Sequence, residues 1–223
     1  MRPEASNRLT LYSYWRSSAA YRVRIALHLK GLDFKTLPVH LTRHGGEQNA
    51  GAYRAVNPQG LVPVLLHGKQ VLTQSMAICE YLDEAFDAHP LLPADAPGRA
   101  RVRSLALQIA CEIHPLNNLR VQKYLKRQCG DAADTVAWMR HWMQAGFTAI
   151  EQRLDETRVG YSGNDAGHPG LFECFLVPQV YNAERYGMDM SAFPAIREIV
   201  SRCRELAAFT RAAPENQPDA EPL

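Results

Sequence analysis

A proline-rich segment in the middle of the chain separates two halves that differ in the spacing of their apolar residues. The segment His89–Pro97 contains three prolines, a composition typical of a linker. Short apolar stretches rich in β-formers precede it and predict strands, whereas apolar residues spaced three and four apart follow it and predict helices. We therefore predict two domains, residues 8–88 and residues 98–216. A length of 223 residues suits two small domains.

The first half predicts a small α/β unit. Its helices are expected near Ser17 and Ser18 through Lys30, where Gly31 supplies the C-terminal cap, and again from Ser75. Its strands are expected at Leu9–Tyr14, Phe34–Val39, Leu61–Leu66 and Gln70–Leu72, the last two forming a hairpin. The resulting order of strand, helix, strand, strand, strand, helix is typical of an α/β unit with helical crossovers.

The second half predicts an all-α domain. Its clearest apolar stripe is formed by Val136, Met139, Met143, Phe147, Ile150 and Leu154. Similar spacing marks an upstream helix at Leu105, Ile109 and Ile113, and a last helix at Ile196, Ile199, Cys203 and Leu206. Pro115 and Pro178 lie within apparent helices and are expected to kink them. The polar, proline-rich tail from Pro214 is expected to fray.

Composition and charge argue against several classes of function. The chain has 25 basic and 23 acidic residues, a net charge of +2, and so lacks the basic surplus typical of a nucleic-acid binder. No run approaches the ~18 apolar residues of a transmembrane helix, and the polar stretch Met1–Arg8 predicts no secretory signal. Five scattered cysteines without a Cys-x-x-Cys pair predict reduced thiols, with neither a disulfide framework nor a metal site. We therefore expect a cytoplasmic protein.

Five motifs, in order along the chain, carry a resemblance to a known family. They are Ser17–Ala26 (SSAAYRVRIA), Asn57–Pro63 (NPQGLVP), Gln74–Tyr81 (QSMAICEY), Ile113–Arg120 (IHPLNNLR) and Val177–Arg185 (VPQVYNAER). Together they resemble zeta-class glutathione transferases, and the last two resemble the maleylacetoacetate isomerases of that class. The resemblance extends from about Leu9 to Asp219. It implies a thioredoxin-like α/β N-terminal domain followed by an all-α C-terminal domain.

The resemblance implies glutathione as the cofactor, with its thiol at the start of the first helix. A free thiol with a pKa of ~8.5 is only about 3% thiolate at pH 7, so the protein must stabilise the thiolate. Ser17 and Ser18 are the implied catalytic residues. A hydroxyl there can donate to the sulfur, and the helix N-terminus supplies partial positive charge. On the residues alone, capping of the helix is the simpler interpretation of both serines.

The other glutathione contacts that the resemblance implies lie in later motifs. The bond between Val62 and Pro63 is expected to be cis, with the Val62 backbone presented to an extended peptide. Gln74 and Ser75 would receive the γ-glutamyl carboxylate at a helix N-terminus, although Ser75 could serve only as an N-cap. Further implied contacts, each of which could instead be an ordinary surface or core residue, are Gln48, His114 and Asn118.

The implied substrate is a small dicarboxylate, and three arginines are candidates to bind it. They are Arg16, Arg120 and Arg185, each from a different part of the motif set. Arginine binds carboxylates through its two-pronged guanidinium group, which also stabilises charge that develops during the reaction. Each of the three could instead be a solvated surface charge.

Two positions depart from the family pattern. Ala19 stands where the first motif usually has a cysteine, so glutathione must supply the sulfur. Gly170 and Glu173 stand where the family has a Ser/Thr-x-x-Asp capping box. Because glycine is tolerated at an N-cap at a cost of only a few tenths of a kcal/mol, we expect a slightly weaker cap and an unchanged fold.

The resemblance implies a homodimeric, glutathione-dependent isomerase that converts maleylacetoacetate to fumarylacetoacetate in tyrosine and phenylalanine breakdown. Glutathione would supply a thiolate that adds reversibly to the cis double bond. No nucleic-acid or membrane partner is expected. The alternatives are a maleylpyruvate isomerase of gentisate breakdown, a general glutathione transferase or peroxidase, and a non-catalytic binding protein. The last is disfavoured because a mere scaffold has no need of Ser17, Pro63, Gln74 and Ser75 together.

Overall fold

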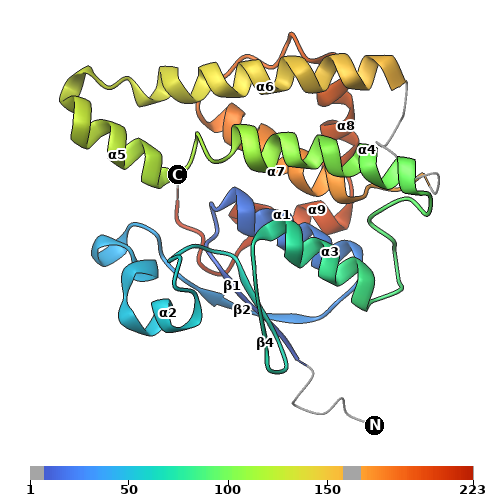
Figure 1. Ribbon diagram of the computed structural model, residues 1–223, viewed down its shortest axis with the longest axis horizontal. Helices are drawn as coiled ribbons and strands as arrows, with labels where there is room; N and C mark the ends of the chain where they lie inside the picture. The colour runs from blue at the N-terminus through green and yellow to red at the C-terminus, as the bar shows by residue number, and fades with distance from the viewer. Residues whose placement is uncertain (1–7, 158–166, 223) are drawn as a thin grey trace. The chain divides into compact units, whose positions relative to one another are not determined.

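The computed structural model describes residues 8–157 and 167–222, and its contacts divide the chain into two compact units (Figure 1). The first unit combines Met1–Leu91 with Glu205–Leu223, and the second is Leu92–Arg204. Residues 205–216, which the sequence prediction assigned to the helical domain, therefore group with the first unit. No helix among the described residues is long and apolar enough to span a membrane.

A four-stranded mixed sheet forms the centre of the first unit. The strands are β1 (Leu9–Ser13), β2 (Phe34–Pro38), β3 (Val64–His67) and β4 (Gln70–Thr73), in the spatial order β2-β1-β3-β4. β1 runs parallel to β2 and antiparallel to β3, which forms a hairpin with β4. The period of two that predicted β1 is visible in its burial, since Leu9, Leu11 and Ser13 are buried and the residues between them only partly so.

Helices α1 (Ser18–Leu29), α3 (Ser75–Ala85) and α9 (Ala207–Ala212) lie on the same side of the sheet, where α1 contacts both α3 and α9 (Figure 1). The contact with α9 is what places the end of the chain in this unit. A further short helix, α2 (Gly51–Val56), and 3₁₀ turns at Arg43–Gly45 and Glu47–Asn49 were not predicted. They are too short to show a helical period, and Tyr53 is the one buried residue of α2.

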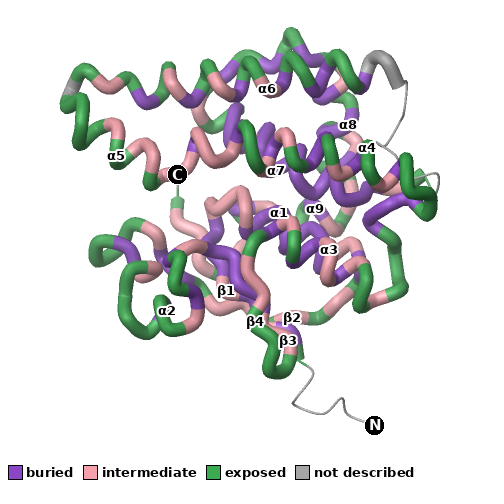
Figure 2. Tube along the Cα trace, in the orientation of Figure 1, coloured by how far each residue is buried: buried purple, intermediate pink, exposed green. Residues whose placement is uncertain are grey.

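Helix α1 is buried along most of its length, including two arginines. Every residue from Ala20 to Leu27 is buried, and purple marks the visible part of α1 beyond its first turn in Figure 2. Arg24 donates to the carbonyl oxygens of Ala212 at 2.9 Å and Trp15 at 3.0 Å, and to the hydroxyl of Ser13 at 3.1 Å. These acceptors compensate the cost of burying a cation and tie α1 to α9 and to the end of β1.

The second unit is all-helical, as predicted, and the predicted fold class is confirmed. Its helices are α4 (Ala96–Leu107), α5 (Leu119–Cys129), α6 (Thr135–Thr157), α7 (Leu171–Arg185) and α8 (Pro194–Arg204), with a π-helical turn at Gln108–Ile113 and a 3₁₀ turn at Gly130–Ala132. The predicted stripe on α6 is buried from Met139 to Leu154, whereas its first member, Val136, is 38% exposed. Glu173, 1% exposed, accepts from the Gly170 N–H at 2.8 Å, which confirms the cap predicted for α7.

Four local predictions at element ends are wrong. Leu206 is not on the last helix of the second unit but precedes α9 as its N-cap. Pro97 lies in the first turn of α4, where Asp95 caps the helix, rather than in a linker. Pro115 lies in the turn before α5 and not inside a helix. The tail is not frayed, because Pro214–Asn216 forms a 3₁₀ turn and Asp219 accepts a hydrogen bond from Trp15.

Candidate functional site

The strand register brings four predicted segments of the first unit to one end of its sheet. Ser13, the last residue of β1, pairs with Pro38, the last residue of β2. Tyr12 pairs with Val64, the first residue of β3, and Val64 in turn pairs with Thr73, the last residue of β4. The segments that follow or precede these ends therefore lie near one another. They are residues 14–18, 39–48, 62–63 and 74–75, and they contain every site residue predicted in this unit.

Ser17 is the N-cap of α1, and its hydroxyl keeps a proton to donate. The Ser17 Oγ accepts a hydrogen bond from the Ala20 N–H at 3.2 Å. An oxygen that accepts in a cap still carries its own hydrogen, so capping and donation to a thiolate are compatible. Ser18 is the first residue of the helix and not its cap. The expectation that Ser18 serves the cap is therefore wrong.

Arg16 is held against the aromatic residues that precede the helix. Its Cζ lies 4.8 Å from the centre of the Trp15 ring, and its Nη2 lies 3.5 Å from the Tyr14 hydroxyl. Trp15 and Tyr14 are themselves buried, while Arg16 is partly exposed. Arg16 directly precedes Ser17, and its guanidinium group packs against two buried aromatic side chains.

The peptide bond between Val62 and Pro63 is cis, as predicted. The preceding loop is held by its own side chains, since Tyr53 and Asn57 both donate to the Leu61 carbonyl, at 2.6 and 2.8 Å. Burial raises the pKa of the Tyr53 phenol, which therefore remains a donor at physiological pH. These bonds fix the backbone directly before Val62.

Gln74 and Ser75 begin α3 with an unusual backbone. Gln74 is the N-cap and has a φ of 69°, a conformation that costs a non-glycine residue of order 1–3 kcal/mol. Its Nε2 donates to Gln59 Oε1 at 2.9 Å. Ser75, buried and first in the helix, accepts from Arg22 Nη1 at 3.1 Å. The interpretation of Ser75 as a simple N-cap is wrong, and its hydroxyl is free to donate toward an anion.

Gln48 lies in the 3₁₀ turn Glu47–Asn49 with its side chain folded over its own loop. Its Nε2 donates to the Leu41 carbonyl at 3.3 Å, and its Oε1 is buried without a hydrogen-bond partner among the described residues. Gly46, with a φ of 104°, makes this packing possible, because a Cβ there would lie 2.5 Å from Gln48 Nε2.

In the second unit, Asn118 has a structural role and Arg120 is exposed. Asn118 is the N-cap of α5, and its Oδ1 accepts from the Arg120 N–H at 3.0 Å. The alternative of core packing is therefore wrong for Asn118. His114 is partly exposed at the end of the π-helical turn.

Arg185 is the last residue of α7 and is oriented by its neighbours. Its Nη2 donates to Asn182 Oδ1 at 3.2 Å, and its Cζ lies 4.3 Å from the centre of the Tyr186 ring. The side chain is exposed, so both contacts restrict a guanidinium group that remains accessible.

Among the described residues of the first unit, no exposed thiol lies at this end of the sheet. Ala19 contributes none, and the thiol nearest in sequence to the α3 start, Cys79, is fully buried. Burial raises the pKa of the Cys79 thiol to about 12, which keeps it protonated and unreactive.

Sequence reasoning missed Arg22, which the structure places directly behind Ser75. Arg22 is 2% exposed and carries a positive charge next to the predicted carboxylate position. The sequence could have indicated it, because Arg22 and Arg24 lie two positions apart in an otherwise apolar part of the first motif. An arginine is seldom fully buried unless it is paired.

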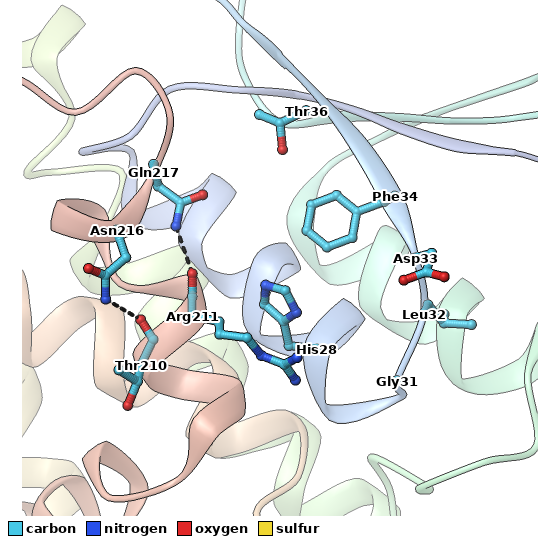
Figure 3. A pocket seen from close by; sticks show the side chains of 10 residues that line it. All are labelled: His28, Gly31, Leu32, Asp33, Phe34, Thr36, Thr210, Arg211, Asn216 and Gln217. Atoms are coloured by element: carbon cyan, nitrogen blue, oxygen red, sulfur yellow. Dashed lines mark hydrogen bonds between the residues drawn. The ribbon is translucent and has the colours of Figure 1, made fainter.

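A hollow of about 450 Å³ lies at the other end of β2, around Phe34 and Thr36 (Figure 3). His28 and Arg211 face it from α1 and α9, and no predicted site residue lines it. Burial, with the charges of Arg211 and Arg24, lowers the pKa of His28 to about 4.

The fold and the four strand-end segments define a glutathione transferase. Residues 7–84 match the family described as the glutathione S-transferase N-terminal domain. A probable maleylacetoacetate isomerase of Vibrio cholerae is 50% identical over 214 residues, which cover 95% of this chain and 98% of that protein. The chain belongs to the zeta class of the glutathione transferase family.

Two solved structures are similar over nearly the whole chain. One is a maleyl pyruvate isomerase, described as a bacterial zeta-class glutathione S-transferase. It is 47% identical with a TM-score of 0.89, and the match covers 95% of this chain and all of that one. The other is a maleylacetoacetate isomerase of Methylobacterium extorquens AM1 with bound malonate and GSH. It is 35% identical with a TM-score of 0.90, and the match covers 96% of this chain and all of that one.

Proposed function

We propose that this protein is a glutathione-dependent cis–trans isomerase that converts maleylacetoacetate to fumarylacetoacetate. The observation that carries the proposal is the convergence of four segments at one sheet end, with the Ser17 hydroxyl at the start of α1. A relative named probable maleylacetoacetate isomerase is 50% identical to this chain. Bound glutathione supplies a thiolate that adds reversibly to a conjugated double bond.

The residues of the first unit fit glutathione. The Ser17 hydroxyl and the N-terminus of α1 would stabilise the thiolate, and Ser18 would add a second hydroxyl. Ser75, backed by the charge of Arg22, would receive the γ-glutamyl carboxylate. The cis Val62–Pro63 segment would pair with the peptide backbone. The Oε1 of Gln48, which has no hydrogen-bond partner in the described part of the chain, would accept from the same ligand.

The residues proposed to bind the substrate are arginines. Arg16, Arg120 and Arg185 would bind the two carboxylates and stabilise negative charge that develops on the substrate's conjugated oxygens. The maleylacetoacetate isomerase of Methylobacterium extorquens AM1 was solved with malonate, a dicarboxylate, and GSH together. His114 and Asn118 are proposed to contact glutathione from the helical unit. A homodimer and a cytoplasmic location remain part of the proposal.

A turnover assay with both maleyl acids tests the proposal. We expect glutathione-dependent isomerisation of maleylacetoacetate, retention on immobilised glutathione and a dimeric mass by light scattering. Faster turnover of maleylpyruvate would favour the second candidate, which the 47% identity to a maleyl pyruvate isomerase supports. No turnover of either acid with glutathione present would refute both.

A further inference from the structure

The last described residues of the chain bind two of the four segments at the site end of the sheet. Asp219 Oδ2 accepts a hydrogen bond from the Trp15 N–H at 3.0 Å, although the two residues are 204 positions apart. Glu221 forms an ion pair with Arg43. Between them, Ala220 packs against a cluster of buried apolar side chains that includes Tyr14, Trp15 and Val39. We call residues 219–221 the C-terminal strap.

At one end the strap fixes the backbone that leads to Ser17. Trp15 is 1% exposed, so water cannot readily satisfy its N–H if Asp219 is removed. The Trp15 carbonyl is held in turn by Arg24 Nη2 at 3.0 Å. Both backbone polar groups of Trp15 are thus hydrogen-bonded. The following turn closes through the Ser17 N–H, which donates to the Tyr14 carbonyl at 2.9 Å.

At the other end the strap contacts the loop that leads to Gln48. His40 accepts from the Thr42 and Arg43 N–H groups at Nδ1, at 3.3 and 2.9 Å, which places the ring proton on Nε2. That Nε2 lies 3.4 Å from Glu221 Oε1. The hydrogen bond from Arg43 holds the pKa of the Glu221 carboxyl below its ordinary value.

The loop itself is closed by paired bonds between its two ends. The His40 N–H donates to the Glu47 carboxylate at 2.7 Å, and the Glu47 N–H donates to the His40 carbonyl at 2.8 Å. Gln48 follows directly. We therefore expect a displacement of His40 to move Glu47 and, with it, Gln48.

We propose that the C-terminal strap positions the two ends of the glutathione site, with Asp219 and Glu221 as positioning residues. The inference builds on the proposed function, because it assigns the thiol end to Ser17 and the other end of the cofactor to Gln48. Asp219 fixes the thiol end and Glu221 the Gln48 end. Each acts through the backbone that it holds, and neither is proposed to contact the sulfur or the substrate.

Asp219 variants distinguish the hydrogen bond to the Trp15 N–H from the negative charge of the carboxylate. We expect Asp219→Ala to raise the KM for glutathione roughly fivefold or more, the effect of losing one hydrogen bond, and to raise the pKa of the bound thiol. Asp219→Asn retains an oxygen that can accept from Trp15 and should return both values to within about twofold of wild type. Glu205→Gln, which removes one charge at an exposed position of the same unit, is the matched control.

Glu221 variants test the other end. We expect Glu221→Gln and Arg43→Ala each to raise the glutathione KM about two- to fivefold, consistent with an exposed ion pair, without changing the thiol pKa. The double variant should be no worse than the single ones. If Asp219→Ala does not fold, the Glu221 and Arg43 variants still test whether the strap affects glutathione binding.

The controls separate this inference from the proposed function. Calorimetry of wild-type protein with glutathione comes first, and absence of binding there refutes the proposed function and the inference with it. If wild type binds but Asp219→Ala keeps the wild-type glutathione KM and thiol pKa, the strap proposal alone is refuted. An Asp219→Ala defect that Asp219→Asn does not reverse also overturns it, because the hydrogen bond would then not be responsible.

Discussion

Replacing Ser17 by alanine removes two interactions from one oxygen. The Oγ accepts from the Ala20 N–H at 3.2 Å as the cap of α1, and the same hydroxyl is proposed to donate to the glutathione thiolate. The cap is worth about 1 kcal/mol of folding free energy, so Ser17→Ala should fold. The catalytic effect comes from the second interaction, and the two can be measured apart.

The expected size of the catalytic effect follows from the strength of a hydrogen bond to a charged group. Such a bond contributes about 1.5–3 kcal/mol, which corresponds to about one to two units of thiol pKa. The hydroxyl stabilises the thiolate and lowers its pKa, so its removal raises the pKa. Turnover at pH 7 should therefore fall about ten- to a hundredfold and recover as the pH rises through the new pKa.

Titration of the thiolate absorbance of bound glutathione measures this shift directly. Ser17→Ala and Ser18→Ala are compared, together with Ser17→Gly, which loses the hydroxyl but costs the cap only a few tenths of a kcal/mol. We expect both Ser17 variants to shift the pKa equally and Ser18→Ala to shift it less. A larger shift in Ser18→Ala, or none in any variant, would refute the assignment and favour the backbone N–H groups at the start of α1.

Two further predictions concern other parts of the molecule. Arg120→Ala and Arg185→Ala should each raise the substrate KM by about ten- to a hundredfold, the loss of one charge-assisted contact, and leave glutathione binding unchanged; wild-type kinetics in both would place the carboxylate contacts elsewhere. For His28, a pKa lowered to about 4 means that the unfolded state binds the extra proton first. The free energy of unfolding should then fall by about 1 kcal/mol, after allowance for partial exposure, as the pH drops from 6.5 to 4. His28→Asn should abolish this pH dependence of the free energy of unfolding, measured by denaturant titration at each pH. An unchanged pH dependence would show that His28 is not its cause.

The strands and the long helices could be predicted because their apolar period is local. Leu9, Leu11 and Ser13 alternate inward on β1, and Met139 to Leu154 recur on one face of α6. Val136 belongs to the same apolar stripe but is exposed. The spacing of apolar residues predicts the buried face of a helix but not where along the helix its packing against other elements ends. Gly31 was predictable because glycine favours the positive φ at which this helix ends. The cis bond before Pro63 was predictable only from the family resemblance, because about 5% of X-Pro bonds are cis.

The failures occur where distant residues decide the structure. The tail is polar and proline-rich, yet Trp15 and Arg43 hold it through Asp219 and Glu221. Nothing in the local sequence of the tail reports a partner so far away. A serine at a helix start also left the N-cap open as an alternative for Ser75, but buried Arg22 donates to its hydroxyl and Gln74 holds the cap position.

Two helix N-termini and a buried arginine place positive charge at the site end of the sheet. α1 begins five residues after β1 ends and α3 begins two residues after β4 ends, and the register places those two strand ends together. Two helix N-termini, each carrying about half a positive charge, therefore lie at the same end, and buried Arg22 adds a full charge behind Ser75.

This arrangement suits a ligand with two anionic ends, a thiolate and a carboxylate. It also explains how the chain can lack the cysteine that usually follows the two serines. With Ala19 in that position and Cys79 held protonated by burial, the proposed chemistry needs no protein thiol. It needs a hydroxyl donor and fixed positive dipoles, which Ser17 and the start of α1 provide.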